Sequence, residues 1–204
     1  VAAAIRGDKK APDLLKAVPP AQRSAGYFFA EAEYLRKRKK YADAAAIVMK
    51  APTDRDALVD PDAWWVERRV LSRELMDQGD MKTAYAIVAA HTAESPANAA
   101  DAEFHAGWFA LRGLNDPQRA AKHFSRIAGL AQGPISLSRA YYWLGRAAEA
   151  GGPGDAKEYF SKAAAYGTTF YGEWAGERIG RKTLTLVYPE PTAADRQTFA
   201  GREA

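Results

Sequence analysis

The sequence predicts an all-α protein, a superhelical solenoid built from helical hairpins. Two successive segments carry small or apolar residues at positions i, i+4 and i+7, a spacing that places all three on one face of an α-helix. One hairpin cannot bury such a stripe alone, so neighbouring hairpins must stack to complete the core. The stripes consist of Ala120, Phe124 and Ile127, followed by Ala156, Phe160 and Ala163.

The same register extends toward the N-terminus. The two stripes are 36 residues apart (156 − 120), and another step of 36 leads back to Ala84 and Val88. Ala44 and Val48 lie a further 40 residues upstream (84 − 44). Hairpins repeated in register in this way indicate a solenoid.

Composition excludes several classes of protein. The chain has 204 residues, of which 48% are hydrophobic and 26% charged, as in ordinary folded proteins. It contains no cysteine, which excludes disulfides, thiol catalysis and cysteine metal sites. No apolar run approaches the roughly 20 residues of a membrane-spanning helix. The chain opens at Val1, without an initiator methionine or a signal peptide, so we expect a processed protein or a fragment.

The net charge of +4 is mild, and residues 36–40 form the one cationic run. Such a run could bind nucleic acid, or it could oppose the dipole at the C-terminus of a helix. We favour the second interpretation and expect no nucleic-acid partner, because a single cluster is a small footprint for nucleic acid.

Caps and breakers divide the N-terminal half. Asp60 and Pro61 supply a helix cap followed by proline at the first helical position. Gly79 and Asp80 then end that helix and cap the next one. Residues 12–18, closed by two prolines, read as the end of an earlier repeat. The further helices predicted here span residues 22–38, 41–50, 62–78 and 81–92.

The C-terminal half repeats these signals at Asp116 and Pro117. Helices are predicted at residues 99–114, 117–130, 136–150, 155–166 and 168–180. Residues 1–180 therefore form the predicted solenoid, and residues 181–204 an extended linker, at 181–191, with the start of a truncated helix. Thr192 and Asp195 suggest a capping box for that helix. Because no capping repeat closes the array, we expect the natural protein to continue and the missing part to carry the chemistry.

A search for catalytic motifs identifies no catalytic, cofactor-binding or metal-binding residue. The three histidines, His91, His105 and His123, lack the spacing of a zinc site and are interpreted as helix-face residues. No phosphate loop, nucleophile elbow or dinucleotide fingerprint is present. The carboxylates stand beside Arg and Lys, in the manner of solvated surface pairs. Composition and periodicity thus favour a binding or scaffold protein.

Part of the repeat resembles a tetratricopeptide unit. The run Tyr141-Tyr142-Trp143-Leu144-Gly145 is similar to the aromatic-x-x-Leu-Gly start of that family, and residues 156–160 to its Ala-x-x-x-Phe step. The periods of 36 and 40 residues exceed the family's period of about 34. Small residues at Gly107 and Gly145 would let the paired helix approach closely at Ala120 and Ala156. A tetratricopeptide-like adaptor that binds protein segments along a concave face is the alternative function.

A wider set of motifs resembles the superhelical domain of soluble lytic murein transglycosylases, from about residue 14 onward. The set is specific as a whole, although no single motif would suffice. It comprises Pro61-Asp62-Ala63-Trp64-Trp65-Val66-Glu67-Arg68-Arg69, Ala106-Gly107-Trp108, Asn115-Asp116-Pro117, residues 120–124 and 134–140, Thr168-Thr169-Phe170-Tyr171-Gly172-Glu173-Trp174-Ala175, Glu177-Arg178-Ile179-Gly180, and residues 191–196.

This resemblance implies a ring- or horseshoe-shaped superhelix from a periplasmic enzyme. The family cleaves the MurNAc-GlcNAc β-1,4 bond of peptidoglycan without water and forms a 1,6-anhydro end. Its catalytic glutamate, followed by serine, lies in a separate lysozyme-like domain that this chain lacks. Glu94-Ser95 precedes Pro96 in a polar loop and is not assigned that role. The implied partners are glycan strands of peptidoglycan and the chain's own missing catalytic domain.

Four aromatic residues are candidates for contact with glycan or with that domain: Phe170, Tyr171, Trp174 and Trp64. Trp64 and Trp65 lie about 100° apart on a helix, so at most one should point straight into the core. Packing against the neighbouring hairpin is the alternative role of Phe170 and Tyr171. Residue 173 is Glu where the family more often has Gln, and Trp174 replaces an aliphatic residue. Four further aromatics fall on the repeat stripes and are expected in the core: Trp108, Phe124, Trp143 and Phe160.

Overall fold

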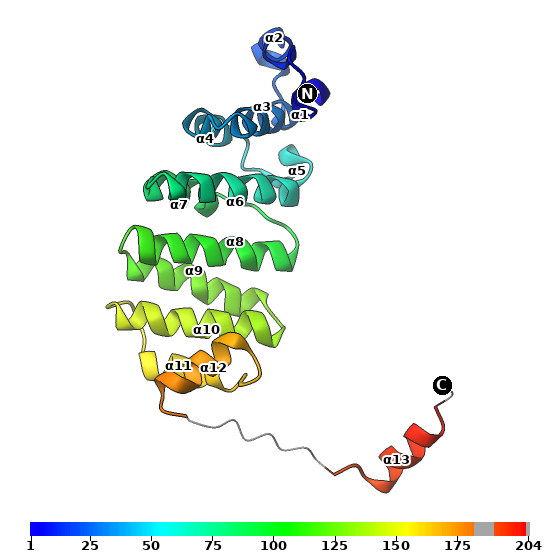
Figure 1. Ribbon diagram of the computed structural model, residues 1–204, viewed down its shortest axis with the longest axis vertical. Helices are drawn as coiled ribbons and strands as arrows, with labels where there is room; N and C mark the ends of the chain where they lie inside the picture. The colour runs from blue at the N-terminus through cyan, green and yellow to red at the C-terminus, as the bar shows by residue number, and fades with distance from the viewer. Residues whose placement is uncertain (182–189, 203–204) are drawn as a thin grey trace.

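The computed structural model describes residues 1–181 and 190–202, and every regular element in them is helical, which confirms the all-α prediction. Figure 1 shows the helices stacked in the order of the chain, with α13 apart from the stack. Helices pack chiefly on their neighbours in sequence, as α9 does on α8 and α10. The helices are α1 (Ala2–Ile5), α2 (Ala11–Lys16), the 3₁₀ turn η1 (Pro20–Gln22), α3 (Ala25–Lys37), α4 (Tyr41–Val48), α5 (Arg55–Leu58), α6 (Pro61–Asp77), α7 (Met81–Ala89), α8 (Pro96–Trp108), the π-helix η2 (Phe109–Gly113), α9 (Pro117–Leu130), α10 (Pro134–Glu149), α11 (Ala156–Ala164), α12 (Phe170–Arg178) and α13 (Ala193–Ala200).

Aspartate caps start the helices where the sequence predicts them. The Asp60 carboxylate accepts a hydrogen bond from the Ala63 amide at 2.9 Å, and α6 follows with Pro61 in its first turn. Asp80 and Asp116 cap α7 and α9 in the same way, at 3.0 and 2.9 Å. Each cap satisfies one of the backbone N–H groups that a helix leaves without an internal partner.

The start of α8 differs from the prediction. This helix is predicted to begin at residue 99, whereas α8 begins at Pro96. Ser95 is its N-cap, with the hydroxyl 3.4 Å from the Asn98 amide, and the Asp62 carboxylate accepts from the amides of Glu94 and Ser95. The signal is again a cap followed by proline, here with serine in place of aspartate. The short helix α5 was not predicted either.

The repeat stripes form the core. Phe124 and Ile127 of α9 are fully buried, as are Val88 of α7 and Val48 of α4. The two glycines of the repeat lie against phenylalanine rings. A Cβ atom at Gly107 would lie 2.4 Å from the ring of Phe124, and one at Gly145 would lie 2.6 Å from the ring of Phe160. The close approach was expected at the alanines of the stripe, but the glycines make room for the rings.

Ala120 and Ala156, which occupy equivalent positions of the predicted repeat, differ in their surroundings. Ala120 is fully buried, whereas Ala156 is half-buried at the start of α11. We expect Ala120→Leu to lower the free energy of unfolding by about 1–3 kcal/mol, because added methylene groups overpack a filled core. The loss in Ala156→Leu should be smaller, since part of the side chain can extend into solvent. Denaturant titration of both variants tests this, and equal midpoints would contradict it.

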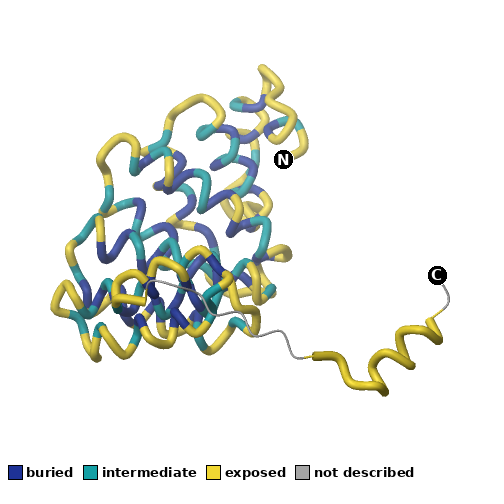
Figure 2. Tube along the Cα trace, turned by 60° about the horizontal axis from the view of Figure 1, so that its bottom comes forward, coloured by how far each residue is buried: buried dark blue, intermediate teal, exposed yellow. Residues whose placement is uncertain are grey.

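The C-terminal region contains the predicted capping box. The Thr192 hydroxyl and the Asp195 carboxylate bond to each other's backbone amides at the start of α13. The helix ends at Ala200, although we expected it to continue through residue 204. Most of the predicted extended segment, residues 182–189, lies outside the described residues. Figure 2 shows α13 exposed along its whole length.

Candidate functional site

The last helix of the stack, α12, presents an aromatic shelf, which we define as Phe170, Tyr171 and Trp174. Phe170 is 58% exposed and Trp174 is 44% exposed, and their ring centroids are 4.3 Å apart. Tyr171 is half-buried and packs on Tyr142 of α10, with centroids 5.4 Å apart. Tyr171 therefore packs against the neighbouring helix α10, the alternative role considered for it, while Phe170 and Trp174 expose ring surface.

Residues just before and inside α12 fix the position of the shelf. The Thr169 hydroxyl lies 2.8 Å from the buried Ser138 hydroxyl on α10 and accepts from the Gly172 amide at 3.1 Å. A Cβ atom at Gly172 would lie 2.0 Å from the carbonyl oxygen of Tyr166, so only glycine fits there. The threonine and the glycine thus anchor the first turn of α12 against α10, and this turn carries Phe170 and Tyr171.

A groove of about 450 Å³ lies beside the shelf, between α10 and α12. Arg178 donates to both carboxylate oxygens of Glu149, at 2.7 and 2.9 Å, and Arg146 lies 3.1 Å from the same carboxylate. One carboxylate therefore holds two guanidinium groups in place. An aromatic face beside fixed donors and acceptors suits a ligand with both apolar faces and hydroxyl groups. The lining residues are Tyr142, Arg146, Trp174, Glu177 and Arg178.

Trp64, the fourth candidate, does not belong to this surface. It is 2% exposed and packs edge-on against Phe29 of α3, at a centroid distance of 5.2 Å. Trp65 is also fully buried, so the expectation that at most one of the pair points into the core is wrong. The reason is that α6 contacts α3, α4 and α5 as well as α7 and α8, which covers more than one of its faces.

Beside Trp64, α6 buries a guanidinium group. Arg68 is almost fully buried, donates to the Ile87 carbonyl at 3.0 Å and lies 5.9 Å from the centre of the Trp64 ring. Burial lowers the pKa of Arg68 to about 10, so the group still carries its charge at neutral pH. Its role in this position is to bind the end of α7, where helix carbonyls lack internal partners.

A second group of polar residues meets where α7, α8 and α9 pack together, and we call it the Glu103 cluster. Glu103 and His123 are buried, Tyr85 and His91 are half-buried, and Arg126 is exposed. His123 Nδ1 donates to Glu103 Oε2 at 2.6 Å, while Arg126 donates to Oε1 at 3.2 Å. His91 Nε2 lies 3.4 Å from Oε1, and the Tyr85 hydroxyl lies 3.0 Å from His123 Nε2. Sequence spacing gave no sign of this cluster, because its members are distant in sequence.

The Glu103 cluster holds its carboxylate ionised. Burial alone would raise the pKa of Glu103, but hydrogen bonds from His123 and His91 outweigh it and bring that pKa to about 2. The expectation that carboxylates form solvated surface pairs is therefore wrong here, since Glu103 is only 6% exposed. It is also wrong for Glu67, which is buried and accepts from Arg36 at 2.6 and 2.8 Å.

The cationic run at residues 36–40 is largely engaged within the protein. Arg36 pairs with Glu67, Lys37 pairs with Glu33 at 2.9 Å, and Arg38 lies 3.7 Å from the centre of the Tyr34 ring. Arg36 and Lys37 occupy the last turn of α3, where positive charge opposes the helix dipole. These contacts favour the structural interpretation of the run.

The predicted core aromatics divide into two pairs. Phe124 and Phe160 are buried, as expected, whereas Trp108 and Trp143 are half-buried. Trp143 still packs on Phe104 and on Phe124, with centroids 6.0 and 5.9 Å apart. The two tryptophans therefore contribute to packing from the edge of the core.

Comparisons with protein-family models, with curated proteins and with solved structures give no match for this chain. Across residues 1–181 and 190–202, none of the helices combines the length and apolar character needed to cross a bilayer. In the same residues, no group of three or more His, Cys, Asp or Glu side chains is arranged to hold a metal ion.

Proposed function

We propose that this chain is the non-catalytic superhelical module of a periplasmic peptidoglycan lytic transglycosylase. Its helical hairpins would continue as a ring- or horseshoe-shaped solenoid that scaffolds a separate lysozyme-like domain and contacts glycan strands. The observation that carries the proposal is the anchoring of α12, since Thr169 and Gly172 have specific packing roles in one of the segments that carry the resemblance.

The state of the carboxylates supports a non-catalytic role. Glycosidic cleavage needs a carboxylic acid that stays protonated near neutral pH in an apolar pocket. Glu103 has the opposite property, because its neighbours lower its pKa to about 2. Glu67 is paired with Arg36, and both Glu94 and Glu173 are exposed. None of these carboxylates therefore lies in an apolar pocket, and ground-state binding alone would not accelerate cleavage.

The groove beside the aromatic shelf is the proposed glycan contact. Sugar rings present apolar faces that stack on aromatic side chains, and their hydroxyl groups pair with fixed polar groups. Trp174 supplies the aromatic face, and the guanidinium groups held by Glu149 supply donors. Trp64 takes no part in this contact, because its side chain is buried.

The test incubates the purified chain with murein sacculi and measures both binding and products. We expect the chain to sediment with the sacculi and to release no anhydro-muropeptides detectable by mass spectrometry. Trp174→Ala should weaken sedimentation, whereas Ile135→Ala should not, because Ile135 is 72% exposed at the start of α10 and does not line the groove.

Three outcomes would contradict the proposal. Anhydro-muropeptides above the buffer control that disappear in Glu173→Gln or Glu94→Gln would show that the chain itself is catalytic. Absence of sedimentation would remove the glycan contact and favour the tetratricopeptide-like adaptor. Equal weakening by Trp174→Ala and Ile135→Ala would place the contact outside the groove.

A further inference from the structure

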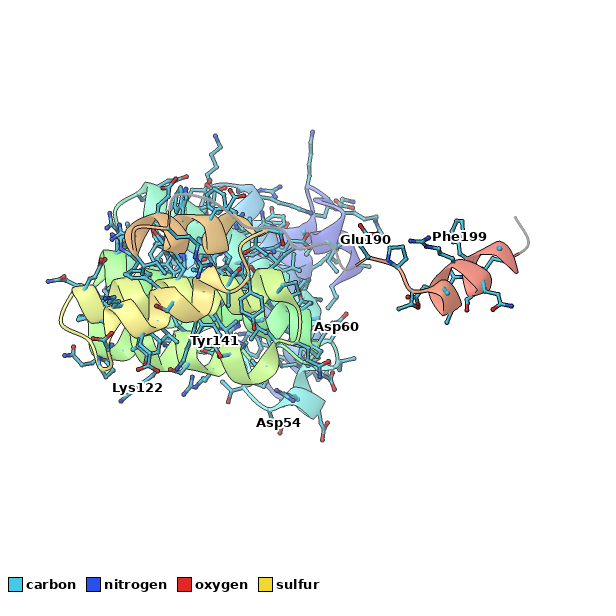
Figure 3. All side chains as sticks on the ribbon, turned by 90° about the horizontal axis from the view of Figure 1, so that it is seen from below. Asp54, Asp60, Lys122, Tyr141, Glu190 and Phe199 are labelled. Carbon is cyan, nitrogen blue, oxygen red and sulfur yellow. The ribbon has the colours of Figure 1, made fainter. Side chains whose placement is uncertain are left out.

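The helix α13 has no packing partner among the described residues. It is 8 residues long, every one of its residues is exposed, and Phe199 is 75% exposed. Figure 3 labels Phe199 and shows it on α13, to one side of the stacked helices. Isolated helices shorter than about 12–15 residues are marginal in water. The capping box favours the helix but buries no apolar surface, so a stable α13 requires another surface to pack on.

The aromatic shelf on α12 offers such a surface. Phe170 and Trp174 are one helical turn apart and expose adjoining ring faces. Glu173 lies one turn after Phe170, and Glu177 lies three residues after Trp174, so aromatic and acidic side chains share one side of the helix. Both carboxylates are exposed, and neither forms an ion pair with another residue that the structure describes.

Two arginines lie close to Phe199 in the sequence. Arg196 lies one turn before Phe199 on α13, and Arg202 follows the end of the helix, three residues after Phe199. Asp195, also one turn before Phe199, is held in the capping box with Thr192. Arg196 approaches Glu190 only to 3.9 Å, and both side chains are largely exposed, so this pair contributes little and does not hold Arg196 in place. An aromatic ring with one cation on α13 and a second just after the helix therefore matches exposed rings flanked by carboxylates on α12.

The connection is long enough for α13 to reach the shelf. Eleven residue steps separate Arg181, just after α12, from Thr192, the cap of α13 (192 − 181). At roughly 3.3–3.6 Å per residue, a chain of this length can span roughly 36–40 Å. An intramolecular contact also has the advantage of a high effective concentration of the two surfaces.

We propose that α13 docks on the aromatic shelf of its own chain. Phe199 packs against Phe170 and Trp174, while Arg196 and Arg202 face the carboxylates of α12. This contact is independent of the proposed function and holds for any role of the protein. Because Trp174 also lines the groove, docking covers part of that groove, and a ligand bound there would compete with α13.

Hydrogen–deuterium exchange of the amides in residues 196–202 tests this docking in the full chain. We expect these amides to exchange about tenfold more slowly than in Phe199→Ser, since an undocked helix of this length is barely protected. Trp174→Ser should remove the protection as well, provided that the amides of α12 keep theirs. Ile135→Ser, which replaces a residue of similar exposure on α10, should leave it unchanged.

Each remaining outcome decides against the proposal. Exchange in the unaltered chain that is as fast as in Phe199→Ser would show that α13 does not dock. Protection that survives Trp174→Ser and also Phe170→Ser would place the contact elsewhere. Protection that is lost on roughly hundredfold dilution would show that the partner is a second copy, since only an intermolecular contact depends on concentration.

Discussion

Glu103→Gln is expected to lower the free energy of unfolding by about 3–5 kcal/mol, the range found when a buried charge pair loses one partner. The carboxylate bridges three helices, since it accepts from His123 and Arg126 on α9 and lies near His91 after α7. Glutamine has nearly the same shape, but its NH₂ group would face donors where an oxygen now accepts. The loss of stability in Glu103→Gln therefore reflects the missing charge and its hydrogen bonds, because the side-chain volume hardly changes.

The same group makes stability depend on pH in a defined direction. The pKa of Glu103 falls from 4.5 in its unperturbed state to about 2 in the folded protein. A lowered pKa means that the contribution is complete above about pH 4.5 and is lost as the pH falls toward 2, and the difference corresponds to about 3 kcal/mol. Denaturant titration at pH 7 and at low pH measures the free energy of unfolding of the unaltered chain and of Glu103→Gln. The difference between the two values should therefore shrink as the pH falls.

An exposed ion pair provides the control. Glu158 pairs with Lys162 at 2.6 Å on α11, and both side chains are about half exposed. Glu158→Gln should change stability by less than about 0.5 kcal/mol, because solvent screens such a pair. If Glu103→Gln were as mild as this control, the Glu103 cluster would not be a stabilising bridge.

Gly107→Ala is expected to destabilise the protein by about 1–3 kcal/mol, although alanine is the better helix former. The added Cβ atom would lie 2.4 Å from the Phe124 ring, closer than any non-bonded contact allows. Phe124 is fully buried, so its ring cannot move away without disturbing the core between α8 and α9. Overpacking should therefore exceed the gain in helix propensity.

Gly129 in the last turn of α9 is the matched control, because a Cβ atom there would meet no other atom within 4 Å. Gly129→Ala should stabilise the protein by up to about 1 kcal/mol, since only the conformational preference changes. Opposite signs for the two variants in denaturant titration would confirm the close approach at Gly107. Equal stabilisation would show that α8 and α9 are farther apart than the structure has them.

The sequence was most informative where local chemistry decides the structure. Asp60, Asp80 and Asp116 cap helices at the predicted places because a cap needs only its own next turn. The buried stripe follows from the helical period alone. Ser95 gives the same type of signal as the aspartates, and it starts α8 three residues before the predicted residue 99 (99 − 96).

Features that depend on packing between distant helices could not be predicted in this way. Trp64 is buried because α3 covers it, and no property of α6 alone indicates how many neighbours that helix has. The partners of Glu103 lie 12, 20 and 23 residues away (103 − 91, 123 − 103, 126 − 103), at distances that match no local motif. Phe170 and Trp174 were identified as surface candidates, and both are exposed, whereas the anchoring of their helix by Ser138 was not anticipated.

The π-helix Phe109–Gly113 shows how the layers accommodate chain length. Seventeen residues separate Gly107 from Phe124, but only fifteen separate Gly145 from Phe160 (124 − 107, 160 − 145). Both rings nevertheless lie on their glycines. A π-helical turn takes up more residues than an α-helical one, and it lies in the longer of the two connections. Insertions and deletions at these corners can thus leave the interior unchanged, so layers of this kind are better aligned by the contact between glycine and phenylalanine than by a constant period.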